Sequence, residues 1–375
     1  MRHERHSARS RSRLRAEASR RAGHRIPWRG LLSLARISDA LPVPCEDVGM
    51  DAWGTRPPED PYFDSRLNAW VLSRYKDVTA ALREAHLIPA SARSTTAAVA
   101  VDSATHAEFR SQALRALAPV RLQQLEAQFT PIAIGMAGAL PAGQPVDLVE
   151  HYAKPWSLEV AGIAADIPPG QRERLSGLAR SIFDAACEPY DAALDAAARK
   201  ASAELARFFQ GAPPLNMQMF IALAHSLPAL LGNAWLALFE SPVEVTDLPK
   251  TIDQLLRVAG PAKAQFRQAI APVTIRECQI ARDQRVILRL DIANRDPDEF
   301  PDPGELRFDR SSPAHLAFGN GLHACVGAAL VRSAAAVATK TLLDRFAIGE
   351  HTAVPVDSFA VRYVSSLRVT LQAHS

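Results

Sequence analysis

Residues 315–330 read His-Leu-Ala-Phe-Gly-Asn-Gly-Leu-His-Ala-Cys-Val-Gly-Ala-Ala-Leu and place one cysteine, Cys325, among glycines and alanines. Glycine lets a backbone turn sharply and lie close against a flat surface. The Ala-rich run from Ala328 to Phe346 predicts a helix, so Cys325 stands just before a helix N-terminus. The positive end of the helix dipole favours the thiolate form of cysteine. The stretch therefore predicts a thiolate held beneath a flat ligand.

The spacing within this stretch is Phe-x-x-Gly-x-x-x-Cys-x-Gly, met by Phe318, Gly321, Cys325 and Gly327. It resembles the haem-binding loop of the cytochrome P-450 family. A lone cysteine in a glycine-rich turn is usually an inert core residue. The complete motif favours an axial ligand to haem iron instead. The resemblance implies haem b as the cofactor, with Cys325 on the iron and His323 also at the cofactor.

The composition is that of a soluble globular protein, with 375 residues, 48% hydrophobic and 22% charged. No continuous run of about 18 apolar residues stands out, so we expect no membrane span. The four cysteines, Cys45, Cys187, Cys278 and Cys325, form no CxxC pair and no metal-like spacing. Neither a zinc site nor a disulfide framework is indicated, and a reducing cytoplasm fits.

Residues 1–30 form a basic extension that carries ten Arg and two Glu, a local balance of +8. Because the whole chain has a net charge of +3, the remainder is mildly acidic at −5. The extension has few apolar residues and no helical stripe, which predicts disorder. We expect residues 31–375 to form a single haem-binding domain.

The extension has other interpretations. Its Arg-rich, acid-poor composition resembles an organelle transit peptide, and Ser19-Arg20-Arg21 weakly resembles a twin-arginine signal. The apolar run Leu31 to Ala35 is too short for export and ends at Arg36. Nucleic-acid binding by the tail is less favoured than a solvated extension. We therefore expect a cytoplasmic protein without a nucleic-acid partner.

The resemblance covers roughly residues 60–375 and implies a mainly α fold with small β-sheets, the cytochrome P-450 fold. Residues 69–73 predict a strand, and residues 361–372 predict another at the end of the chain. Residues 88–101 suit a loop, which in the family roofs the substrate pocket. Helical patterns cover Tyr75–Ala85, Leu122–Leu140, Leu158–Ile167, Arg172–Glu188, Ala192–Phe209 and Leu215–Glu240.

Cationic side chains are expected where haem propionates would lie. His106 and Arg110 stand four residues apart and share one helix face. The resemblance places this pair on one propionate, Arg267 on a second and His315 at a third contact. The chemistry is sound, because a buried carboxylate needs a cationic, hydrogen-bonded partner.

The distal helix departs from the family. Where the family has an acid and a threonine that relay protons, this chain has His225 and Ser226, and Leu223 replaces a glycine. His225 titrates near physiological pH and is a candidate relay with Ser226. Equally open is the interpretation that the helix has drifted and His225 only contacts substrate or core. Pro228 predicts that the helix bends or opens between Ala224 and Pro228, since proline lacks an N–H.

Gln254-Leu-Leu-Arg257 stands where the family has Glu-x-x-Arg, joined by a third residue that is Arg310 here. Gln254 brings no charge, and a lone buried cation is costly. We therefore expect Asp253 or main-chain carbonyls to neutralise Arg257. Only 28 residues separate Ser226 from Gln254, which predicts a trimmed helix between them.

Three functions remain open. The resemblance implies a haem-thiolate oxidoreductase of the soluble bacterial type. It would hydroxylate, epoxidise or desaturate a small, largely apolar substrate in specialised metabolism, with electrons from ferredoxin and ferredoxin reductase. The altered distal helix favours, as a second hypothesis, peroxide-driven oxidation or a redox-neutral rearrangement or dehydration. The third hypothesis is a non-catalytic haem-binding protein.

Overall fold

The computed structural model describes residues 59–90, 103–241, 243–308, 310 and 314–374, without the side chains of residues 103–106, 214 and 357. The described residues all belong to one compact unit. The basic extension and most of the loop predicted at residues 88–101 lie outside the described residues.

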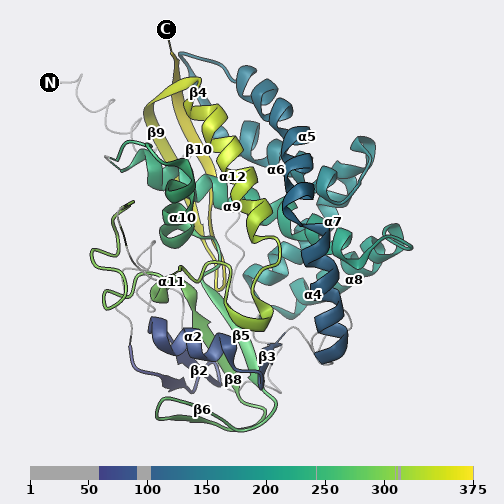
Figure 1. Ribbon diagram of the computed structural model, residues 1–375, viewed down its shortest axis with the longest axis vertical. Helices are drawn as coiled ribbons and strands as arrows, with labels where there is room; N and C mark the ends of the chain where they lie inside the picture. Colours follow the sequence, from purple (N-terminus) through teal and green to yellow (C-terminus); the bar gives the residue numbers. More distant parts are fainter. Residues whose placement is uncertain (1–58, 91–102, 242, 309, 311–313, 375) are drawn as a thin grey trace, which may run out of the picture. The chain divides into compact units, whose positions relative to one another are not determined.

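The fold is mainly α with small sheets, as predicted (Figure 1). The helices are α2 (Tyr75–Arg83), α4 (Ser103–Ala116), α5 (Pro119–Gly138), η3 (Val149–Ala153), α6 (Lys154–Ala164), α7 (Pro169–Cys187), α8 (Ala192–Phe208), α9 (Pro214–Phe239), α10 (Leu248–Ala259), α11 (Leu290–Ala293), η4 (Gly321–His323) and α12 (Ala328–Leu343). The strands are β1 (Tyr62–Asp64), β2 (Ala69–Leu72), β3 (Leu87–Pro89), β4 (Pro145–Asp147), β5 (Ala264–Ala269), β6 (Val273–Ile275), β7 (Cys278–Ile280), β8 (Arg285–Arg289), β9 (Phe346–Asp357) and β10 (Arg362–Ala373).

The described strands form three sheets. The largest has the order β1-β2-β8-β5-β3, in which β2 and β8 are parallel and the other pairs are antiparallel. Its register sets Arg267 of β5 opposite Val286 of β8 and Pro89 of β3. A second sheet has the order β4-β10-β9, and β6 pairs with β7. The first sheet thus holds one of the predicted cofactor contacts at a fixed place.

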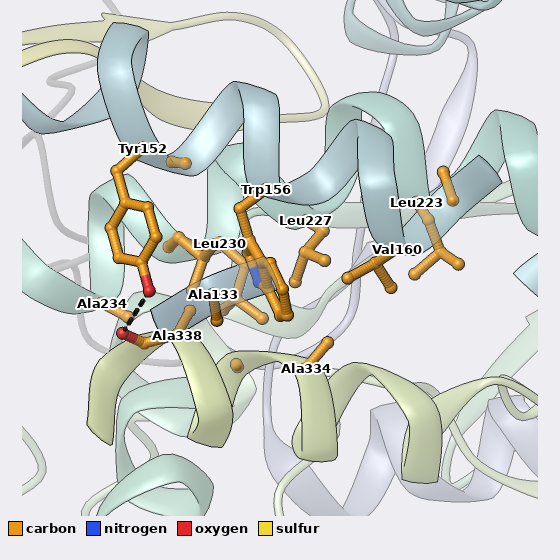
Figure 2. Close-up of a cluster of buried hydrophobic side chains, with 14 of the residues drawn as sticks. Ala133, Tyr152, Trp156, Val160, Leu223, Leu227, Leu230, Ala234, Ala334 and Ala338 are labelled. Carbon is orange, nitrogen blue, oxygen red and sulfur yellow. Dashed lines mark hydrogen bonds between the residues drawn. The ribbon is translucent and has the colours of Figure 1, made fainter. Parts of the chain in front are cut away.

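The main core lies where α5, α6, α9 and α12 meet (Figure 2). The Tyr152 and Trp235 rings stack with centroids 5.6 Å apart, and Phe129 meets Trp156 edge-on at 5.3 Å. The Tyr152 hydroxyl donates to the carbonyl oxygen of Ala338 at 3.3 Å. Burying each such aromatic contributes about 1.5–3 kcal/mol. This packing supports α12, the helix that follows Cys325.

Helix α9 is long and apolar enough to cross a membrane by length and composition. Its apolarity has a simpler cause, because 72% of this stretch is buried inside the protein. Figure 2 shows Leu223, Leu227 and Leu230 among the core side chains that face α6 and α12. A helix that is apolar nearly all round suits the centre of a large core.

Of the predicted bend or opening of α9 between Ala224 and Pro228, the opening does not occur. The helix runs without a break from Pro214 to Phe239, and Pro228 is buried within it. A proline costs the helix one hydrogen bond. Here Leu227, Leu230 and Leu231 are packed in the core on either side, and this packing keeps the helix whole. Between α9 and α10 the described residues contain no further helix.

Candidate functional site

The loop before α12 is closed by its own main chain. The Cys325 N–H donates to the Phe318 carbonyl oxygen at 2.9 Å, and the Gly319 N–H donates to the Leu316 carbonyl oxygen at 2.8 Å. Gly319 and Gly321 both have a φ of +70°. A Cβ on Gly321 would also lie 2.7 Å from the Leu82 carbonyl oxygen of α2. Only glycine fits there, so these glycines set the path of the loop that presents the cysteine.

The thiol of Cys325 has two opposing influences on its pKa. Its residue is exposed, yet the protein atoms around the sulfur desolvate it and raise the pKa. The Gly327 N–H at the start of α12, with Arg110 and Arg332, acts in the opposite direction. Desolvation prevails in the pKa of the thiol, while the start of α12 acts towards the thiolate form as the sequence predicts. A metal that coordinates a thiol deprotonates it outright.

Arg110 joins α4 to the cysteine loop. Its Nη1 donates to the Ala324 carbonyl oxygen at 2.7 Å, one residue before Cys325. Figure 1 shows α4 beside the loop that leads into α12. His106 lies on α4, but its side chain lies outside the described residues. The structure thus places Arg110 at the cysteine loop and holds it there by a main-chain contact.

Arg267 is a buried cation that lacks an anion. Its residue is 4% exposed, and burial lowers its pKa to about 10. It donates to the Gln265 side-chain oxygen at 2.7 Å and to the Phe266 carbonyl oxygen at 3.1 Å. Its Nε has no partner, and it pairs with no carboxylate among the described residues. A buried, uncompensated guanidinium fits an anionic group such as a haem propionate.

His315 is held by the protein itself. Its Nδ1 accepts from the Ala317 N–H at 3.2 Å, and its Nε2 lies 3.5 Å from Asp253 Oδ1 and 3.4 Å from Arg332 Nη2. Its side chain is only 7% exposed. The Phe318 ring lies beside it with centroids 5.8 Å apart. His323 lies in η4, two residues before Cys325. The loop thus brings His315, Phe318, His323 and Cys325 together.

The two distal candidates point in different directions. His225 Nε2 lies 2.9 Å from the Ser176 carbonyl oxygen of α7, and its ring is 5.8 Å from the Phe183 ring. Burial is the main reason that the pKa of His225 is lowered. Ser226 is exposed on α9, together with Ala222 one turn before it. The structure agrees with the interpretation of His225 as a core contact and leaves Ser226 accessible.

Leu223 does not occupy the accessible face of α9. It is 4% exposed and packs in the core near Val160 (Figure 2). The residue that α9 presents beside Ser226 is therefore the small Ala222. Although Leu223 replaces a glycine of the family, the rotation of α9 puts it on the core face of the helix.

Arg257 is neutralised largely by main-chain oxygens, as predicted. It is 1% exposed and donates to the carbonyl oxygens of Asn294, Pro303 and Glu305 at 2.7–3.1 Å. Gln254 accepts from its Nε at 3.1 Å. Burial, with Arg310 and Arg295 nearby, lowers its pKa to about 9. Of the two predicted alternatives, the main-chain oxygens are therefore the one found, and the Asp253 carboxylate contacts Arg332 instead.

Sequence reasoning missed two residues that organise the loop, Arg332 and Asn294. Arg332 of α12 donates to Asp253 Oδ1 at 2.7 Å, and its guanidinium carbon lies 4.8 Å from the Phe318 ring centroid. Buried Asn294 accepts from the Leu316 N–H at 2.6 Å. The available signal in the sequence was Arg332, a charged residue in the first turns of the helix that follows Cys325. No cluster of His, Cys, Asp and Glu suited to a separate metal ion occurs in the described part of the chain.

Residues 244–362 match the family model described as Cytochrome P450. The chain is 27% identical over 357 residues to the vitamin D(3) 25-hydroxylase of Pseudonocardia autotrophica, covering 82% of this chain and 89% of that protein. Its structure is similar to CYP109B1 from Bacillus subtilis at a TM-score of 0.71 and 22% identity, covering 82% and 95% of the two chains.

A further similar structure is CYP109E1 from Bacillus megaterium in complex with corticosterone, at a TM-score of 0.71 and 21% identity, covering 84% and 95% of the two chains. These likenesses confirm the cytochrome P-450 fold. With the family-model match and the complete cysteine loop, they establish haem with a cysteine thiolate as the cofactor. Its family-model match, its relatives and its structural neighbours are thus those of cytochromes P450, the haem-thiolate monooxygenases that act on small molecules.

Proposed function

We propose that this chain hydroxylates, epoxidises or desaturates a small, largely apolar molecule at a haem held by Cys325. The observation that carries the proposal is Arg267, a buried cation with an unmet N–H and no carboxylate partner among the described residues. A haem propionate is an anion suited to that guanidinium. Arg110, His106, His315 and His323 complete the proposed set of cofactor contacts, with Phe318, Gly321 and Gly327 shaping the loop.

When bound, haem with a thiolate ligand supplies electron density that favours cleavage of the O–O bond. The residues of this chain bind it, exclude water and move protons. Cys325 is presented by the two glycines of positive φ and by the Phe318 carbonyl oxygen. On the distal side we assign proton movement to the Ser226 hydroxyl, since Ser226 lies on the accessible face of α9. We assign His225 to the contact between α9 and α7.

An apolar substrate agrees with two features. Ala222 beside Ser226 is small and offers no charge to a ligand on this face of α9. The relative named vitamin D(3) 25-hydroxylase and the structure solved with corticosterone concern molecules that are themselves mostly apolar. We propose a substrate of this general character, processed in specialised metabolism in the cytoplasm.

The source of oxidising equivalents has two candidates, ferredoxin with its reductase or peroxide. Peroxide is favoured by the position of His225, whose Nε2 faces a carbonyl of α7. A peroxide already carries the electrons and protons that a relay would deliver, so Ser226 alone suffices. A redox-neutral rearrangement or dehydration is a further outcome, needing neither oxidant.

The test supplies the purified holoprotein with a panel of apolar substrates under three conditions: ferredoxin with reductase and NAD(P)H, hydrogen peroxide, and neither. Oxygenated product under the first or second condition supports the proposal and names the oxidant. Product with neither identifies redox-neutral chemistry. Haem that binds without a substrate-induced spin shift for any candidate, and without turnover in all three conditions, supports the non-catalytic haem protein and overturns the proposal.

A further inference from the structure

One carboxylate of α10 contacts the cysteine loop and α12 together. Asp253 Oδ1 accepts from Arg332 Nε at 2.7 Å and lies 3.5 Å from His315 Nε2. Arg332 Nη2 lies 3.4 Å from the same His315 nitrogen. Three side chains from separate parts of the sequence thus converge on one another, with His315 itself 7% exposed.

The contacts continue from this triad to the cysteine. The Arg332 guanidinium carbon lies 4.8 Å from the Phe318 ring centroid, within the range of a cation–π contact. The His315 and Phe318 rings are 5.8 Å apart. The Phe318 carbonyl oxygen then accepts the Cys325 N–H at 2.9 Å. A continuous path of contacts therefore runs from Asp253 to the main chain of the axial ligand.

The charges on α10 indicate that the Asp253 carboxylate acts on the cysteine loop and not on Arg257. Gln254 gives Arg257 a neutral partner, and main-chain oxygens meet most of its N–H groups. Asp253, one residue earlier, directs its carboxylate to the loop instead. We propose that Asp253 is a positioning residue for the axial cysteine, acting through Arg332, Phe318 and His315. This inference rests on the proposed haem-binding function of the loop.

The competing interpretation is a solvated surface ion pair. The Asp253 side chain is 50% exposed and that of Arg332 is 40% exposed, and such pairs usually contribute little. Two observations favour the positioning role over a solvated surface ion pair. The acid meets a second, nearly buried partner in His315, and His315 with Arg332 lowers the pKa of Asp253 to about 2. Arg332 is also fixed on its other face by the Phe318 ring.

The test compares Asp253→Asn with wild type in the reduced, carbon monoxide-bound holoprotein. We expect a smaller fraction of the thiolate-type Soret band, a shifted reduction potential and a loss of haem affinity of about 10-fold. Asp253→Glu should restore most of the thiolate-type band. Asp247→Asn is the matched control, because Asp247 caps the same helix by accepting from the Lys250 N–H at 3.1 Å. It should behave as wild type.

Each outcome has one meaning. The positioning role would be overturned if Asp253→Asn had the same reduced, carbon monoxide-bound spectrum, the same reduction potential and the same haem affinity as wild type. Equal losses in Asp253→Asn and Asp247→Asn would also overturn it, since any charge loss on α10 would then suffice. If Asp253→Asn does not fold, Asp253→Glu provides the test. Retention of the thiolate-type band in Asp253→Glu supports the positioning role, and loss of the band overturns it. Absence of that band in wild type would instead contradict the proposed function.

Discussion

The Nε of Arg257 donates to Oε1 of Gln254 at 3.1 Å, and no carboxylate among the described residues pairs with this buried guanidinium. A hydrogen bond to a charged acceptor is roughly twice as strong as one to a neutral acceptor. We therefore expect Gln254→Glu to stabilise the protein by about 1–2 kcal/mol, measured by urea unfolding. Gln254→Ala is the matched variant and should destabilise. Equal or lower stability for Gln254→Glu would mean that the carbonyl oxygens already satisfy Arg257.

Arg267→Met is expected to separate haem binding from folding. Because Arg267 is buried without an anion, the haem-free variant should be as stable as wild type or more stable. Haem affinity should fall by about 10-fold, since an anionic partner would lose its cation. Haem titration and thermal unfolding of the haem-free protein provide both measurements.

Arg285→Met on the neighbouring strand is the control, because Arg285 is exposed and lies next to the same sheet position. Arg285→Met should change neither the haem affinity nor the stability of the haem-free protein. Loss of stability in haem-free Arg267→Met, with haem affinity unchanged, would show that Arg267 supports the sheet and not the cofactor.

Gly321→Ala should destabilise the loop strongly. The φ of +70° and the 2.7 Å approach of a Cβ to the Leu82 carbonyl oxygen both oppose the substitution. We expect a cost of about 1–3 kcal/mol in urea unfolding and poor haem incorporation. Gly170→Ala is the comparison, since Gly170 lies in α7 with nothing near its Cβ position, and should be neutral or slightly stabilising. Wild-type stability in Gly321→Ala would contradict the tight contact with α2.

His225 predicts a pH dependence of stability. Burial lowers its pKa below the ordinary histidine value of 6.5, so as the pH falls the unfolded chain binds a proton there before the folded chain does. Stability should therefore be full above pH 6.5 and decline as the pH falls through 6.5 towards the folded pKa. His225→Gln should remove this part of the decline, measured by urea unfolding across that range. His151→Gln, at an exposed histidine, is the control, and a decline retained in His225→Gln would assign it elsewhere.

The cysteine loop could be predicted from sequence because its chemistry is local. Its glycines, its cysteine and the start of α12 are consecutive, and their spacing alone fixes the turn. The direction of His225 could not be predicted in this way, because it depends on how α9 rotates against α7. Periodicity indicates one apolar face, whereas 72% of the apolar stretch of α9 is buried, so the pattern does not single out the face that holds His225.

Pairings between residues far apart in the sequence could also not be predicted from it. The partner of Asp253 is Arg332, 79 residues away, although Arg257 is the nearer cation on the same helix. Helix α6 begins at Lys154, four residues before the predicted start at Leu158, because Pro155 suits a first helical turn. Pro228 shows the opposite case, in which core packing overrides a local helix breaker.

The carbon monoxide difference spectrum of the dithionite-reduced protein, with haem quantitation, tests the central claim most directly. A strongly red-shifted Soret band in wild type, with its loss in Cys325→Ala, is the expected result. Haem bound without that shift would mean that the Cys325 thiol is protonated or displaced, and would favour a non-catalytic haem protein. Absence of bound haem from a folded protein would contradict the proposed site altogether.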